Sequence, residues 1–163
     1  MSKEIHTLSE TVLATCRAAR VRLATAESCT GGLVAAALTD IAGSSDVLER
    51  GFVTYSNEAK TELLGVPAEM IAAHGAVSAQ VATAMVQGAL ARAPVDLAVS
   101  ITGIAGPGGA TKGKPVGLVY FGIGRKRGAA RVERHTFQGD RAAVRAAATE
   151  RALELLLEAV RSG

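Results

Sequence analysis

The sequence predicts an α/β protein in which residues 1–163 form one three-layer α/β/α domain around a mixed, mostly parallel sheet. Two observations carry this prediction. In the first two thirds of the chain, short apolar runs typical of buried strands alternate with helical patterns, which favours parallel strands joined by helices. Later, two strand patterns follow each other with no helix between them, which indicates an antiparallel hairpin and therefore a mixed sheet. A chain of 163 residues fits one such domain.

The first half of the chain divides into elements at its glycines and capping residues. Apolar positions at helical spacing predict a helix over residues 4–19, and the run from Val21 to Ala26 predicts the first strand. Ser56 has the hydroxyl that N-cap positions favour, so a helix is expected directly after it. The other elements expected here are a helix from about Thr30 to Asp40, a strand over 51–55, a helix over 57–64 and a short helix over 67–74.

The second half begins with a helix and ends with a hairpin followed by a long helix. Ser78 is a suitable N-cap for a helix over residues 79–92. The elements expected after it are a buried strand over 95–101, a hairpin of strands over 116–123 and 129–137, and an amphipathic helix from about Asp140 to Val160.

The composition excludes several classes of protein. The net charge is only +3 and aromatic residues make up 3% of the chain, so we expect no nucleic-acid partner. No apolar run approaches the roughly 20 residues of a membrane span, and the first residues lack the order of a signal peptide. We therefore expect a cytoplasmic protein with no membrane partner. Cys16 and Cys29 form no cluster with the histidines, so we expect free thiols and no metal.

The first chemically informative segment is Ala-Glu-Ser-Cys-Thr-Gly-Gly, residues 26–32. It follows a predicted strand and precedes a helical pattern, so it predicts a sharp turn that presents Ser28. Thr30, Gly31 and Gly32 stand where backbone N–H groups stabilise negative charge, either on a phosphate or on an oxyanion. A lone serine before a helix is most often an N-cap, so a catalytic Ser28 requires a base.

Lys60 is the candidate base, because the three histidines are placed as structural residues. His6 lies in the first helical pattern, His74 at a helix end and His135 on a strand, which supports no Ser-His-Asp arrangement. Lys60 falls in the first turn of the helix after Ser56, where the helix dipole disfavours a protonated amine and burial would lower its pKa further. Tyr55 could relay a proton or hold the lysine.

A second signal is the glycine-rich segment over residues 102–109, which follows the buried strand. Thr102, Gly103, Gly106 and Gly108 belong to a loop in which backbone can approach a ligand closely and form an anion-binding nest. The segment lacks the Gly-Lys-Ser/Thr ending of a Walker A loop. Arg141, at the start of the last helix, could clamp a phosphate or carboxylate.

Cys29 competes with Ser28 for the role of nucleophile. A thiolate is intrinsically more nucleophilic than a hydroxyl, and a helix N-terminus lowers the pKa of a thiol. Neighbouring residues in a turn rarely point the same way, so side-chain direction decides between them. The residues alone leave that direction open.

Six segments in one order resemble the CinA C-terminal domain family, over about residues 5–160. The resemblance rests on the segments 26–32, 55–60, 64–66, 74–78, 102–109 and 114–117. It implies a three-layer α/β fold, usually in homo-oligomers, and a nicotinamide-nucleotide amidase that converts nicotinamide mononucleotide (NMN) to nicotinate mononucleotide and ammonia without a cofactor. By motif position, Ser28 resembles the nucleophile, Lys60 the base and Tyr55 a supporting group, with Thr102 and Arg141 as further active-site positions.

One stretch departs from the family's pattern, and one other function class stays open. Residues 110–113 read Ala-Thr-Lys-Gly where relatives often carry a Gly-Thr-Pro-type stretch, which bears on loop rigidity and substrate affinity. The alternative function is a nucleotide- or phosphate-binding module without turnover, of a regulatory or competence- or damage-associated kind. The presence of Ser28, Tyr55 and Lys60 together favours the enzyme.

Overall fold

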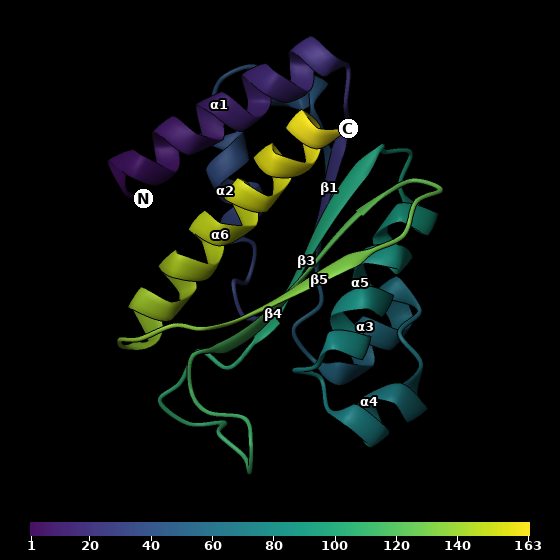
Figure 1. Cartoon of the computed structure of the whole chain (residues 1–163), viewed down its shortest axis with the longest axis vertical. Helices are drawn as coiled ribbons and strands as arrows, with labels where there is room; N and C mark the ends of the chain where they lie inside the picture. The colour runs from purple at the N-terminus through teal and green to yellow at the C-terminus, as the bar shows by residue number, and fades with distance from the viewer.

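A five-stranded sheet lies at the centre of the protein, which a computed structural model describes over residues 1–163. β1 pairs in parallel with β2 and β3, whereas β4 is antiparallel to β3 and to β5. Every strand except β4 therefore points the same way, which confirms the predicted mixed, mostly parallel sheet. Figure 1 labels β1, β3, β4 and β5 across the centre of the molecule. In the sheet order β2-β1-β3-β4-β5, the strands are β2 (Leu48–Val53), β1 (Leu23–Glu27), β3 (Leu97–Gly103), β4 (Leu118–Arg125) and β5 (Arg131–Thr136).

The helices begin largely at side chains that cap them. Ser2, Ser56, Ser78 and Asp140 each accept a hydrogen bond from a first-turn N–H group, as N-cap residues do. No helix is long and apolar enough to span a bilayer. The helical elements are α1 (Lys3–Ala19), α2 (Leu33–Thr39), the 3₁₀ turn η1 (Ser44–Asp46), α3 (Asn57–Leu64), α4 (Ala68–His74), α5 (Ala79–Arg92) and α6 (Arg141–Ser162).

Two element boundaries differ by about three residues from those predicted from the sequence, and the others differ by about two or fewer. α2 begins at Leu33 rather than near Thr30, because the two preceding glycines have φ angles of 59° and 104° and form a turn. β2 begins at Leu48, before the predicted start at residue 51. The charged side chains of Glu49 and Arg50 obscured its first half, and charged residues are typical of an edge strand such as β2.

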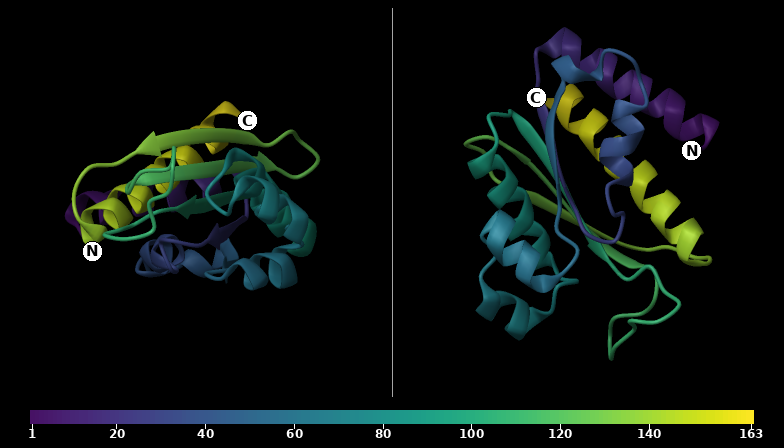
Figure 2. Two further views of the ribbon diagram at one scale, coloured as in Figure 1. Left: turned by 90° about the horizontal axis from the view of Figure 1, so that it is seen from below. Right: turned by 180° about the vertical axis from the view of Figure 1, so that it is seen from behind.

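Helices cover both faces of the sheet, which confirms the three-layer architecture. α1, α2 and α6 lie on one face and α3, α4 and α5 on the other (Figure 2, right). Side chains alternate between the faces along each strand. Leu23 and Leu97 accordingly join the core beneath α1, α2 and α6, whereas Ala24 and Ala98 join the core beneath α5. The direction of any side chain near the end of β1 follows from this alternation.

Candidate active site

The sequence-predicted site residues gather where β1, β2 and β3 end. β1 lies between β2 and β3 and runs parallel to both. The connection after β1 leads to β2 on one side, and the connection after β3 leads to β4 on the other, so the two diverge. Such a switch point is where open α/β sheets place their ligand sites. Ser28 follows β1, Tyr55 follows β2 and Thr102 lies near the end of β3. The topology therefore brings together three segments that are far apart in the sequence.

The turn that carries Ser28 is built around a buried carboxylate. Glu27 is fully buried, and its carboxylate accepts hydrogen bonds from the Thr30 hydroxyl at 2.6 Å, the Val34 N–H at 2.9 Å and the Ala35 N–H at 3.0 Å. These N–H groups belong to the first turn of α2, so a side chain of the protein itself satisfies that helix N-terminus. Two N–H groups of the first turn of α2 are therefore already taken and are not free for a substrate anion.

Free backbone N–H groups in the same turn are fewer than expected. The Gly31 N–H donates to the carbonyl of Ser28 at 2.9 Å, and the Ser28 N–H donates to the carbonyl of Ile101. The N–H groups of Cys29, Thr30 and Gly32 have no acceptor within the chain. Any oxyanion stabilisation by this turn thus depends on those three groups and not on Gly31.

Lys60 reaches the base of the pocket from α3 and is 1% exposed. Its Nζ lies 3.1 Å from the Ser28 Oγ, 3.0 Å from the Thr54 carbonyl oxygen and 3.1 Å from the Tyr55 carbonyl oxygen. No carboxylate lies within ion-pair distance of this amine. Burial lowers the pKa of Lys60, because removal from water disfavours the charged amine. Lys60 is therefore buried, which is the condition under which the sequence predicts a further lowering of its pKa.

The three close contacts of Lys60 match the bonding capacity of a neutral amine. A neutral amine has two N–H donors and one lone pair. When Lys60 is neutral, the carbonyls of Thr54 and Tyr55 take its two donors, and the lone pair remains for the Ser28 hydroxyl. A nucleophile next to a base that is itself oriented by a third group is the arrangement that activates serine.

Ser28 and Cys29 point to opposite faces of the sheet. Ser28 continues the set of Ala24 and Ala26, which face α3 and α5, so it meets Lys60. Cys29 continues the set of Leu23 and joins the core beneath α6, where it is 5% exposed. Burial raises the pKa of the Cys29 thiol to about 11. A thiol held protonated is a poor nucleophile.

Arg141 connects the two walls of the pocket. Its guanidinium donates to the Gly106 carbonyl at 2.8 Å and to the Tyr55 hydroxyl at 3.0 Å. The Tyr55 side chain therefore contacts the arginine, and only the backbone of Tyr55 contacts Lys60. The Thr102 hydroxyl donates to the Ala76 carbonyl at 2.8 Å, which ties β3 to the segment before α5.

These groups surround a pocket of about 220 Å³. The predicted residues in its wall are Ser28, Tyr55, Lys60, Thr102, Gly103 and Arg141. The other predicted binding residues are not part of that wall: the Thr30 hydroxyl bonds to Glu27, and Gly108 is exposed on the loop between β3 and β4. Gly106 is linked to the pocket through its bond to Arg141.

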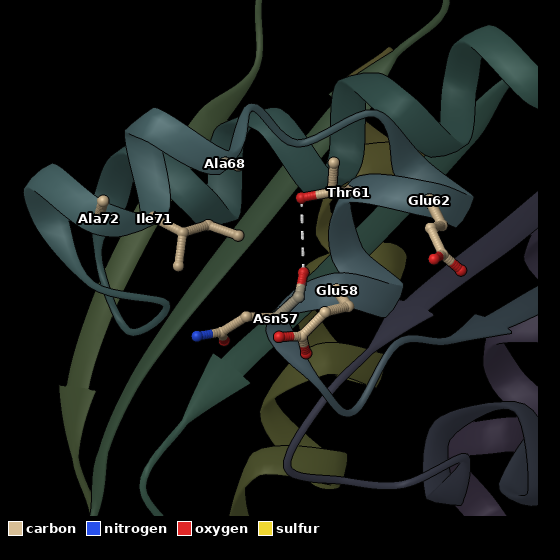
Figure 3. Close-up of a pocket in the computed structure, with 7 residues that line it drawn as sticks. All are labelled: Asn57, Glu58, Thr61, Glu62, Ala68, Ile71 and Ala72. Carbon is tan, nitrogen blue, oxygen red and sulfur yellow. Dashed lines mark hydrogen bonds between the residues drawn. The ribbon is translucent and has the colours of Figure 1, made fainter.

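A larger hollow of about 490 Å³ lies between α3 and α4. Figure 3 shows its lining, which includes the carboxylates of Glu58 and Glu62 and the side chain of Ile71. It holds no serine, cysteine or lysine. We therefore place the chemistry in the smaller pocket.

Two residues that sequence reasoning missed or underrated organise the site. Arg145 donates to the Cys29 carbonyl at 3.0 Å and to the Thr30 carbonyl at 3.2 Å. Its position four residues after Arg141 on one helix is a signal that places both side chains on the same face. Glu27 stands two residues after Thr25 in an apolar strand, and a carboxylate in a buried strand is itself a signal of a specific bonded role. The chain has no group of three or more His, Cys, Asp or Glu side chains arranged to hold a metal ion.

The fold and the pocket define an α/β protein with a small pocket at the carboxyl ends of its parallel strands. Comparison with known families makes the class specific: the CinA C-terminal domain model matches residues 5–160. The chain belongs to the CinA C-terminal domain family, as its sequence motifs predicted.

Known proteins resemble the chain over nearly its full length. The nicotinamide-nucleotide amidohydrolase PncC of Escherichia coli K12 is 54% identical over 153 residues, which are 94% of this chain and 93% of that protein. The enzyme of the same name from Enterobacter agglomerans is 50% identical and covers 95% of this chain and 94% of its own. The crystal structure of the competence/damage inducible protein CihA from Agrobacterium tumefaciens is 43% identical, with a TM-score of 0.94 and coverage of 99% and 98%.

Proposed function

We propose that this protein hydrolyses the carboxamide of NMN to nicotinate mononucleotide and ammonia, with Ser28 as nucleophile and Lys60 as base. The observation that carries the proposal is the 3.1 Å contact between the Lys60 Nζ and the Ser28 Oγ in a buried site with no carboxylate beside the lysine. The choice of substrate rests on the 54% identity to the E. coli nicotinamide-nucleotide amidohydrolase.

The first half of the reaction forms an acyl-enzyme. Neutral Lys60 takes the proton of the Ser28 hydroxyl as the Oγ attacks the carboxamide carbon, and a tetrahedral intermediate forms. Lys60, now protonated, donates to the Thr54 and Tyr55 carbonyls and has one proton for the leaving nitrogen. Breakage of the C–N bond, with that proton, releases ammonia and leaves nicotinoyl nucleotide bound to the Ser28 Oγ as an ester.

The second half reverses these roles with water. Lys60 removes a proton from a water molecule that attacks the ester carbon, and the same proton then returns to the Ser28 Oγ as the C–O bond breaks. The product is the carboxylic acid, which loses its remaining proton to solvent and leaves as the nicotinate carboxylate. The free N–H groups of Cys29 and Thr30 are the candidates that stabilise the oxyanion in both halves, since N–H donors aimed at a developing oxyanion lower the barrier.

The remaining pocket residues suit the nucleotide portion of the substrate. Arg141 presents a guanidinium at the pocket, the group best suited to a phosphate. Tyr55 is 61% exposed beside it, so its ring is free to lie against the pyridinium, and its hydroxyl orients Arg141. Thr102 and Gly103 complete the wall, and the loop through Gly106 and Gly108 follows them in the chain. The cytoplasmic location expected from the composition and the homo-oligomer implied by the family resemblance both stay predictions.

The experiment is an ammonia-release assay with NMN on the wild type, Ser28→Ala, Lys60→Met and Cys29→Ala. We expect activity in the wild type and in Cys29→Ala, and a loss on the order of 10⁴-fold or more in Ser28→Ala. Absence of ammonia from the wild type, with NMN binding detected by calorimetry, would replace the amidase with a nucleotide-binding module. Full activity in Ser28→Ala, with loss in Cys29→Ala, would move the nucleophile to the thiol.

A further inference from the structure

Arg145 of α6 donates its hydrogen bonds to backbone carbonyls rather than to a carboxylate. Its Nε donates to the Cys29 carbonyl at 3.0 Å and its Nη2 to the Thr30 carbonyl at 3.2 Å. It forms no ion pair, although the next arginine on the helix, Arg151, pairs with three glutamates. These two carbonyls belong to the turn that presents Ser28, so the guanidinium holds consecutive peptide groups of that turn.

Holding a carbonyl also sets the direction of the N–H in the same peptide group. In a trans peptide the C=O and N–H bonds point in opposite directions. With the Cys29 carbonyl held by Arg145, the Thr30 N–H points away from α6, and it has no acceptor within the chain. With the Thr30 carbonyl held, the Gly31 N–H points away too and bonds to the Ser28 carbonyl. Arg145 thus orients both the Thr30 donor and the turn that carries Ser28.

The two glycines make this external support necessary. Gly31 and Gly32 have φ angles of 59° and 104°, a conformation that other residues rarely adopt but that glycine also leaves readily. The Glu27 carboxylate fixes the turn from the α2 side, and Arg145 fixes it from the α6 side. A single lysine ammonium cannot reproduce the planar fork that reaches two adjacent carbonyls.

We propose that Arg145 is a positioning residue for catalysis, which holds the Ser28 turn so that the Thr30 N–H is free to receive the oxyanion. This inference rests on the proposed amidase and deepens it. Arg141, one helical turn earlier, contacts Tyr55 and Gly106, so α6 positions the substrate side of the pocket and the nucleophile side with two arginines of one face.

The test compares Arg145→Met and Arg145→Lys with the wild type and with Arg17→Met. Arg17 is a control for the loss of an arginine that donates to a backbone carbonyl, that of Gly43; it also pairs with Asp46 and lies on α1 away from the pocket. Three quantities are measured: kcat and KM for NMN, the second-order rate at which a fluorophosphonate modifies Ser28, and the thermal midpoint. The fluorophosphonate reaction reports the nucleophile and its oxyanion donors without requiring NMN hydrolysis.

We expect Arg145→Met to lower kcat about 10²-fold, a loss typical of one oxyanion donor, with KM changed less than about threefold. The fluorophosphonate rate falls in parallel, Arg145→Lys restores only part of either rate, and Arg17→Met keeps both. Wild-type rates in a folded Arg145→Met would overturn the inference, as would a loss confined to KM. If Arg145→Met does not fold, Arg145→Lys decides by the same criteria. An inactive wild type with NMN would overturn the proposed amidase alone, because the fluorophosphonate rates still test Arg145.

Discussion

Lys60 and Arg151 are two basic side chains on helices of the same protein, and their surroundings are opposite. Arg151 bonds to the carboxylates of Glu133, Glu154 and Glu158, and its pKa is raised above the ordinary value by those partners. Lys60 is more deeply buried but bonds only to neutral oxygens, and burial lowers its pKa. A guanidinium stays protonated in any surroundings, whereas burial without a carboxylate favours the neutral form of the Lys60 amine.

This difference in surroundings suits Arg151 to a structural role and Lys60 to a role as a base. A cation surrounded by carboxylates keeps its proton at every accessible pH and ties elements together, here β5 to α6. A buried amine without a counter-charge favours the neutral form, which is the form that accepts a proton from serine. Arg151 thus links two elements of the fold, whereas Lys60 is available as a base.

The largest expected effect is on activity, and it should differ between substitutions of Lys60 and of Arg151. Lys60→Met removes the base, so the rate of ammonia release from NMN should fall by at least about 10²- to 10⁴-fold, the usual contribution of a general base. Arg151→Met should keep the wild-type rate within about twofold, since its contacts lie outside the pocket. Equal losses in both variants would show that the comparison does not separate catalysis from stability.

The pH dependence of the rate should sharpen the comparison next. If Lys60 acts as the neutral base, kcat/KM rises about tenfold per pH unit below its pKa and levels above it. Since burial lowers that pKa, the midpoint should lie below the ordinary value of a lysine. The measurement is a profile of initial rates with NMN. A rate that rises only with an unshifted lysine pKa would contradict a buried neutral base.

Stability should depend on pH in the direction set by Lys60. The folded pKa of Lys60 is lowered, so the unfolded chain binds more protons between the folded and the ordinary pKa, and the free energy of unfolding rises with pH in that window. Relative to Lys60→Met, the wild type should gain about 1.4 kcal/mol for each unit of lowering. Urea titrations of both proteins at neutral and alkaline pH measure the difference.

The smallest expected effect concerns Arg151. Hydrogen bonds from Arg151 lower the pKa of Glu133 to about 2. The stability that the pair of Glu133 and Arg151 contributes is therefore present above the ordinary carboxylate pKa of 4.5 and disappears as the pH falls towards 2. Because both side chains are partly exposed, Arg151→Met should cost about 1 kcal/mol at neutral pH. Urea denaturation at pH 7 and at pH 3 checks this, with a smaller difference expected at pH 3.

Much of the fold follows from local signals in the sequence. The helices over 57–64 and 79–92 lie where Ser56 and Ser78 predicted them, because N-cap hydroxyls and helical spacing are local properties. The start of β2 was missed because its pairing partner, β1, is an element distant in the sequence, and charged side chains there obscure the strand pattern. Boundaries that depend on pairing across the sheet lack a local signal.

The sequence by itself determined which residues were candidates, and the tertiary structure decided how they combine. Ser28, Lys60 and the glycine loop could be found from spacing and chemical type. Only the packing of α3 on one face of the sheet brought Lys60 to Ser28 and left Cys29 in the opposite core. The physical reason is that alternation along β1 fixes the relative directions of neighbouring side chains. The face on which a remote helix delivers the base is a property of the whole fold.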